Sequence, residues 1–238
     1  MRIMFTWMSE HAVDYTNFIS ALPADKRNTT IKNVIAVRDA EHITRPDMIQ
    51  LMMDNKGKED RIQLDIDDMI AQAYVFYFGG FETSLGVMSF TAHQLMANLS
   101  VQMKLRQEID KFLDESNRNL EYLDAVIKEA LRLLSASVLE RVCNRAFELP
   151  PALPGKKPFI VDKGMIIWIL IYAVHHDEKY YDDPEKFRPE RFLVNKLVKH
   201  VVNHDVSFYF PFGLGLKICI GKRFGTLMNK IVLFHLLA

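Results

Sequence analysis

The chain has 238 residues, enough for one large domain or two small ones, and its 49% hydrophobic and 25% charged residues are ordinary for a globular protein. Its 30 Lys and Arg residues balance its 30 Asp and Glu residues, so nothing in the charge indicates nucleic acid or a strongly acidic partner. Two cysteines, Cys143 and Cys219, are too few for a disulfide framework and are typical of a reducing compartment.

The N-terminal half is predicted to be helical. Its opening, MRIMFTWMSEH, has no long apolar region, so we expect no signal peptide. The first sixty residues have helical patterning, and Pro46 is expected in the first turn of a helix through RPDMIQLMM. A charged loop, KGKED, then precedes a long helical segment from Ile66 to Glu115, apolar all round at first and amphipathic later.

The most apolar stretch, Met69 to Ala92, has two interpretations. It is long enough to span a membrane, and Glu82 is its only charged residue. A carboxylate inside a membrane is costly, however, and a central helix buried in a large domain has the same composition. We therefore expect a buried central helix, with a membrane-spanning helix as the weaker alternative.

The C-terminal half combines helices with a small amount of β structure. Leucines and an isoleucine at helical spacing predict a helix through NLEYLDAVIKEALRLL. After the turn-rich LPPALPGKKP, the sequence FIVDKGMIIWILI is expected to form a hairpin around Asp162 to Gly164. The last segment is predicted to be a helix, and the residues expected on its apolar face are Phe224, Leu227, Met228, Ile231 and Phe234. The predicted fold class is mainly α with a minor β hairpin region.

Cys219 lies in the unusual sequence FGLGLKICIGKRFG, where Gly213, Gly215 and Gly221 surround it. A lone cysteine is most often a small buried hydrophobe. Here glycines allow the backbone to pass close to a flat group, while nearby cations and the following helix favour a thiolate. The local motif has no histidine to serve as base for a nucleophile, and the chain has too few cysteines for a zinc site. A single thiolate binding a metal with its own other ligands fits best, which describes haem iron.

The pattern Phe212-x-x-Gly215-x-Lys217-x-Cys219-x-Gly221 resembles the haem-binding motif of the cytochrome P-450 family, the haem-thiolate monooxygenases. Three other segments match the family in the same order: GGFET, the Glu-x-x-Arg sequence at Glu129, and LERVCNR. The sequence over nearly the whole chain is similar to animal microsomal members of the family, particularly those of the insect detoxification type. The resemblance implies that residues 1–238 are a single truncated domain, the C-terminal half of that fold. It would contain the long central helix, the Glu-x-x-Arg helix, the cysteine loop and the following helix, without the N-terminal anchor and early helices.

The resemblance also implies roles for individual residues. Cys219 would be the axial ligand of the haem iron. Lys217, which stands where arginine is usual in the family, and Arg141 would bind the haem propionates. The remaining residues implied near the cofactor are Phe212, Gly213, Gly215 and Gly221 around the sulfur, Gly80 at a groove for dioxygen, and Glu82 and Thr83 as a proton relay. Without the family, the glycines of GGFET would be interpreted as a kink or a close helix contact.

Other residues are expected to have structural roles. Glu129 and Arg132, three apart on a helix, usually form a weak surface pair, but the resemblance implies a triad with Arg191 that supports the cysteine loop. The sequence from His175 to Asp177 could suggest a metal site, and a solvated loop is the preferred interpretation. Cys143 is expected to be a core residue.

The resemblance implies a monooxygenase that inserts one atom of dioxygen into small apolar organic substrates, with electrons from an NADPH-dependent flavoprotein reductase. The expected location is the cytosolic face of the endoplasmic reticulum membrane, although we find no anchor in this chain. Because the early helices are absent, part of the apolar surface of the central helix is expected to be exposed. The alternative is an inactive truncated remnant without stable haem binding, acting as an interaction module.

Overall fold

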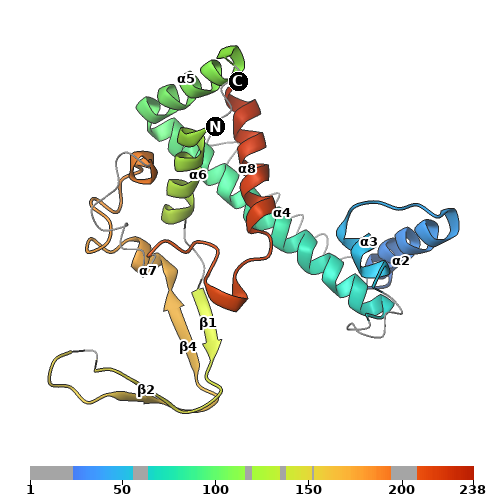
Figure 1. Ribbon diagram of the computed structural model, residues 1–238, viewed down its shortest axis with the longest axis horizontal. Coiled ribbons are helices and arrows are strands. Elements are labelled where there is room, and N and C mark those ends of the chain that lie inside the picture. Colours follow the sequence, from blue (N-terminus) through green and yellow to red (C-terminus); the bar gives the residue numbers. More distant parts are fainter. Residues whose placement is uncertain (1–23, 56–63, 116–119, 135–137, 152, 194–207) are drawn as a thin grey trace. The chain divides into compact units, whose positions relative to one another are not determined.

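The computed structural model describes residues 24–55, 64–115, 120–134, 138–151, 153–193 and 208–238 (Figure 1). The chain divides into two compact units, with the boundary between Ser89 and Phe90 inside a long helix. The described elements are α2 (Ala24–Glu41), α3 (Met48–Met53), α4 (Ile66–Ala97), α5 (Leu99–Glu115), α6 (Glu121–Leu133), β1 (Val138–Val142), β2 (Phe147–Leu149), β3 (Phe159–Val161), β4 (Ile166–Leu170), α7 (Ile171–His175), the 3-10 helices η1 (Pro189–Phe192) and η3 (Gly215–Lys217), and α8 (Lys222–Leu237).

The first unit contains α2, α3 and most of α4. Asp47 is the N-cap of α3, since its carboxylate accepts a hydrogen bond from the Gln50 N–H at 3.0 Å. The same carboxylate accepts two hydrogen bonds from the guanidinium of Arg38 on α2, at 2.8 and 2.6 Å, and this lowers the pKa of Asp47 to about 2. Pro46 therefore precedes the N-cap and is not in the first turn as predicted. The charged loop KGKED lies outside the described residues.

The predicted long helical segment is confirmed, with one interruption. Helix α4 ends at Ala97, and α5 begins after Asn98, whose side chain donates to the carbonyl of Gln94 at 2.9 Å. In the described ranges, no helix has the length and apolar character needed to cross a membrane. The side chain of Val75 is 64% exposed and that of Phe81 is 46% exposed. The central helix is thus not buried all round, and the expected exposure of part of its apolar surface is confirmed.

The core of the second unit lies between α5, α6 and α8. The carboxylate of Glu108 on α5 caps α6 by accepting hydrogen bonds from the backbone N–H groups of Tyr122 and Leu123, at 2.6 and 2.9 Å. The apolar periodicity that predicted α6 is confirmed, because Leu123 and Ile127 are buried. The buried residues of this core are Leu95, Val101, Leu105, Ile109, Tyr122, Leu123, Val126, Ile127, Ala130, Phe187, Leu233 and Leu237.

Helix α8 is present where it was predicted, and Phe234 of its predicted apolar face packs against the core, but most of the buried face is different. Phe224, Leu227 and Ile231 are exposed, whereas Leu233 and Leu237 enter the core. Most faces of α8 carry apolar side chains, so its packing against α5 and α6 decides which of them is buried.

The β structure consists of two antiparallel pairs, β1 with β4 and β2 with β3. The hairpin predicted around Asp162 to Gly164 is therefore wrong, since the two runs flanking that turn pair with earlier strands. The reason is that Cys143 continues the β1–β4 ladder, donating its N–H to the carbonyl of Met165 at 2.9 Å and accepting from the Gly164 N–H at 2.7 Å. The predicted class, mainly α with minor β, is confirmed. Cys143 is half-exposed, with its Sγ donating to the carbonyl of Arg145 at 2.7 Å, so it is not a core residue.

Candidate functional site

The cysteine loop, residues 212–221, is closed by backbone hydrogen bonds. The Cys219 N–H donates to the carbonyl of Phe212 at 2.8 Å, and the Gly213 N–H donates to the carbonyl of Phe210 at 2.9 Å. The 3-10 helix η3 lies between these contacts, and α8 begins directly after the loop. Cys219 is therefore held by the backbone at the start of a sixteen-residue helix.

Cys219 is exposed, which contradicts the interpretation of this residue as a small buried hydrophobe. Apolar side chains of the same loop are exposed too, at 104% for Leu216 and 83% for Ile220. Among the residues that the structure describes, no group of three or more His, Cys, Asp or Glu side chains could hold a metal ion. One accessible sulfur in a loop with exposed apolar side chains suits a flat apolar group whose metal already has other ligands. The loop therefore fits haem.

The glycines of the loop have different backbone requirements. Gly213 and Gly215 have φ angles of +79° and +71°, in the left-handed region that glycine adopts most readily. A Cβ on Gly213 would also lie 3.1 Å from Cδ2 of Leu139. Gly221 has a φ of −80°, and a Cβ there would be 3.8 Å from Sγ of Cys219, an ordinary contact. Two of the three glycines are thus needed for the shape of the loop.

Replacing Gly213 with alanine is expected to lower the free energy of unfolding by about 1–2 kcal/mol, because an L-residue is strained in the left-handed region. Urea denaturation of the full chain, followed by circular dichroism, measures the change. Gly221→Ala is the control within the same loop and is expected to change the free energy by no more than about 0.5 kcal/mol. Equal losses in the two variants would contradict this account of the loop.

Arg141 lies beside the cysteine loop. Its Nη2 donates to the carbonyl of Leu214 at 3.2 Å, and its Nη1 donates to the carbonyl of Glu140 at 2.7 Å. Strand β1 therefore brings this guanidinium to the loop. Binding of a haem propionate by Arg141 and by the exposed Lys217 stays a prediction.

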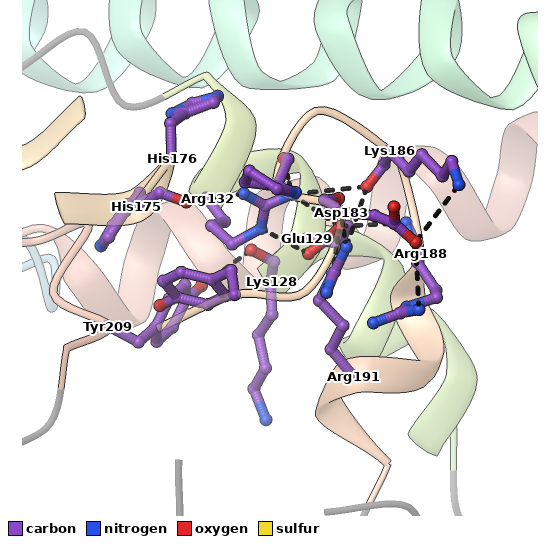
Figure 2. A network of polar contacts seen from close by, with 12 residues as sticks. Lys128, Glu129, Arg132, His175, His176, Asp183, Lys186, Arg188, Arg191 and Tyr209 are labelled. Carbon is purple, nitrogen blue, oxygen red and sulfur yellow. Dashed lines mark hydrogen bonds and ion pairs between the residues drawn. The ribbon is translucent and has the colours of Figure 1, made fainter. Parts of the chain in front are cut away.

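The predicted triad of Glu129, Arg132 and Arg191 is confirmed (Figure 2). Oε2 of Glu129 accepts from Nε of Arg132 at 2.8 Å, and Oε1 accepts from Nη2 of Arg132 at 2.9 Å and from Nε of Arg191 at 3.1 Å. All three residues are buried, and burial lowers the pKa of Arg191. The guanidinium of Arg132 also donates to the carbonyls of His175 and Pro184, both at 2.7 Å. The triad thus fixes the irregular chain before and within η1 against α6.

His175 is a residue whose importance the sequence analysis missed. It is fully buried at the end of α7, so the predicted solvated loop is wrong at this position, whereas His176 is partly exposed and Asp177 is exposed. Nε2 of His175 accepts a hydrogen bond from the backbone N–H of Phe210 at 3.1 Å. Desolvation by burial is the largest influence on this ring, and it lowers the pKa of His175 to about 4. His175 ends the apolar run IIWILIYAV, and this context could have separated it from His176.

Gly80, Glu82 and Thr83 lie on α4 in the first unit. Glu82 and Thr83 are exposed, Gly80 is partly exposed, and the Thr83 hydroxyl donates to the carbonyl of Gly79. The cysteine loop belongs to the second unit. The roles of these three residues in dioxygen binding and proton transfer therefore stay predictions.

Comparison with known proteins identifies relatives along the whole chain. A family model for cytochrome P450 matches residues 1–238. The chain is 35% identical to cytochrome P450 9e2 of Blattella germanica over 96% of this chain and 46% of the relative. It is 37% identical to probable cytochrome P450 9f2 of Drosophila melanogaster, over 87% of this chain and 42% of the relative. Human cytochrome P450 3A5 is 35% identical over 92% of this chain and 44% of the relative.

The chain thus spans a little under half the length of these curated relatives. The match includes the cysteine loop, the triad and the strand that carries Arg141. The family resemblance seen in the sequence is confirmed, and the chain belongs to the cytochrome P450 family.

Proposed function

We propose that this protein is a haem-dependent monooxygenase in which the thiolate of Cys219 is the axial ligand of the haem iron. Members of the cytochrome P450 family bind haem through a cysteine thiolate. The observation that carries the proposal is the exposed Cys219 in a loop that is closed by its own backbone and has exposed apolar side chains. The other cysteine, Cys143, donates its Sγ–H to the Arg145 carbonyl and has no such loop.

In the proposed monooxygenase, individual residues of this chain would have distinct roles in binding haem and in moving protons. When bound, haem supplies the activation of dioxygen and the transfer of one oxygen atom. The Cys219 thiolate would hold the metal and donate electron density to it, and the guanidinium of Arg141 and the ammonium of Lys217 would bind the two propionates. Glu82 and Thr83 would move protons, because a threonine hydroxyl both donates and accepts hydrogen bonds, and Gly80 would leave space for dioxygen.

The proposed substrates are small apolar organic molecules, and the proposed electron donor is an NADPH-dependent flavoprotein reductase. The family of the chain supports both. The proposed location is the cytosolic face of the endoplasmic reticulum membrane, by analogy with the microsomal members that the sequence resembles.

Ligation by Cys219 can be tested without a substrate. The full chain is expressed, supplied with haem, reduced and treated with carbon monoxide, and its difference spectrum is recorded. We expect a weak thiolate-type Soret band that Cys219→Ser abolishes, because a serine hydroxyl is not ionised at neutral pH. Cys143→Ser is the matched control and is expected to keep the band. A band that survives in Cys219→Ser, or that Cys143→Ser abolishes equally, would overturn the proposal.

A second candidate is the non-enzymatic interaction module. The exposed apolar side chains of α4, among them Val75, Phe76 and Phe81, support it, because such surfaces bind other proteins or promote aggregation. Soluble chain that is helical by circular dichroism but shows no haem band would favour this candidate over the monooxygenase.

A further inference from the structure

His175 lies between the buried triad and the chain that leads into the cysteine loop (Figure 2). Its backbone carbonyl accepts a hydrogen bond from Nη1 of Arg132 at 2.7 Å. Its ring nitrogen Nε2 accepts from the backbone N–H of Phe210 at 3.1 Å. Both contacts are buried, so one residue connects α6 to the segment two residues before the loop.

The hydrogen bonds continue from Phe210 to the cysteine. The carbonyl of Phe210 accepts from the Gly213 N–H at 2.9 Å, and the carbonyl of Phe212 accepts from the Cys219 N–H at 2.8 Å. The backbone that carries the sulfur is therefore tied to Phe210, and Phe210 is tied to the His175 ring. The left-handed backbone at Gly213 provides the turn between these contacts.

Aromatic side chains fix the orientation of the His175 ring. It stacks on Tyr209 with the ring centroids 5.6 Å apart and the planes 20° apart, and it lies 5.4 Å from the ring of Phe210 and 6.1 Å from that of Tyr181. The hydroxyl of Tyr209 donates to the carbonyl of Lys128 on α6 at 3.0 Å. The ring thus has little freedom to turn, and its Nε2 points at the Phe210 N–H. Its lowered pKa keeps the ring neutral at pH 7, as an acceptor requires.

We propose that His175 is a positioning residue for the cysteine loop. It accepts the hydrogen bond of the Phe210 amide and so keeps the backbone around Cys219 at a fixed position relative to the triad. The importance of that position for haem rests on the proposed function. The hydrogen-bond role of His175 itself can be tested on the chain without haem.

The test compares His175→Gln with His175→Met by amide hydrogen exchange of the full chain. A glutamine side-chain oxygen can take the position of Nε2 and accept from Phe210, whereas methionine has similar bulk and only a weak acceptor. In His175→Met we expect the amides of Phe210, Gly213 and Cys219 to exchange about tenfold faster. The amide of Ile127 in α6 serves as the internal reference and should keep its wild-type rate, and His175→Gln should restore slow exchange in the loop.

Each other outcome would overturn the proposal. Slow exchange in both variants would mean that the acceptor has no role in the loop. Fast loop exchange in both variants would mean that ring packing, and not the hydrogen bond, holds the chain. Fast exchange that extends to Ile127 in His175→Met would mean that the residue supports the whole unit.

A spectroscopic measurement then connects the loop to the cofactor. With haem and carbon monoxide, a smaller fraction of the protein should show the thiolate-type Soret band in His175→Met than in wild type. In His175→Gln this fraction should be close to that of wild type. An unchanged fraction in His175→Met would overturn the positioning role. A thiolate-type band that persists in Cys219→Ser would instead overturn the proposed function. The hydrogen-exchange result does not depend on haem and would remain valid in that case.

Discussion

Replacing Glu129 with glutamine is expected to lower the free energy of unfolding by about 3–5 kcal/mol, the usual effect of breaking a buried ion pair from one side. The carboxylate accepts hydrogen bonds from Arg132, from Arg191 and from the backbone N–H of Arg188 at 3.0 Å. A neutral amide would leave two buried guanidinium groups uncompensated, and its NH₂ group would meet a donor where an acceptor is needed. Since ordinary domains have only 5–15 kcal/mol of stability, we expect a large shift of the urea denaturation midpoint.

Asp124→Asn is the matched control for this experiment. It makes the same chemical change on the same helix, but Asp124 pairs with Lys230 at 2.7 Å where the two side chains are 38% and 32% exposed. An ion pair so open to solvent contributes at most about 1 kcal/mol. Comparable losses in Glu129→Gln and Asp124→Asn would contradict the structural role given to the triad.

The stability of the protein is expected to fall as the pH is lowered from 6.5 to about 4, because of His175. Its pKa is lowered from 6.5 to about 4 by burial, so the unfolded chain takes up a proton at a pH where the folded chain does not. Acid therefore favours the unfolded state across this window, and the effect levels off below pH 4. At 1.36 kcal/mol per pH unit, the full loss is about 3 kcal/mol. If the His175 ring were protonated in the folded chain, its Nε2–H would point at the Phe210 N–H, and the charged ring would lie near the cation of Arg132.

Urea denaturation at several pH values measures this dependence, and His175→Gln isolates it. The variant lacks the titrating ring, so the difference between the two stability curves should grow as the pH falls from 6.5 to 4 and then stay constant. Asp47, whose pKa is lowered to about 2, affects both proteins equally, and its contribution is lost only at a lower pH. Parallel curves for the two proteins would show that His175 is protonated in the fold as readily as in the unfolded chain.

Local patterns predicted the helices well. The spacing of Leu123 and Ile127 gave the position of α6, and the apolar run from Met69 gave α4, because a helix forms from residues close together in sequence. The triad was also predicted, since Glu129 and Arg132 are neighbours on one helix and the family resemblance provided Arg191. For Cys219, the glycine-rich sequence correctly suggested something other than a core residue.

The predictions that the structure contradicts concern contacts between residues far apart in the sequence. Strand pairing depends on partners that local propensity does not choose, so the run after Gly164 was expected to pair with its neighbour and pairs with β1 instead. The buried face of α8 depends on α5 and α6, which receive Leu233 and not Phe224. His175 was misjudged because the charged residues after it suggested solvent, whereas its ring is buried among aromatic side chains.

The core of the second unit has a consequence for the order in which the protein is made. Leu105 and Leu123 lie on helices that leave the ribosome before α8, and Leu233 and Leu237, which join them in the core, are synthesised more than a hundred residues later. At roughly 5–20 residues per second, the interval is on the order of 10 s. During translation, the apolar surface of α5 and α6 that α8 later covers is therefore exposed, and chaperones can bind it. Co-translational folding of this region cannot finish before α8 leaves the ribosome.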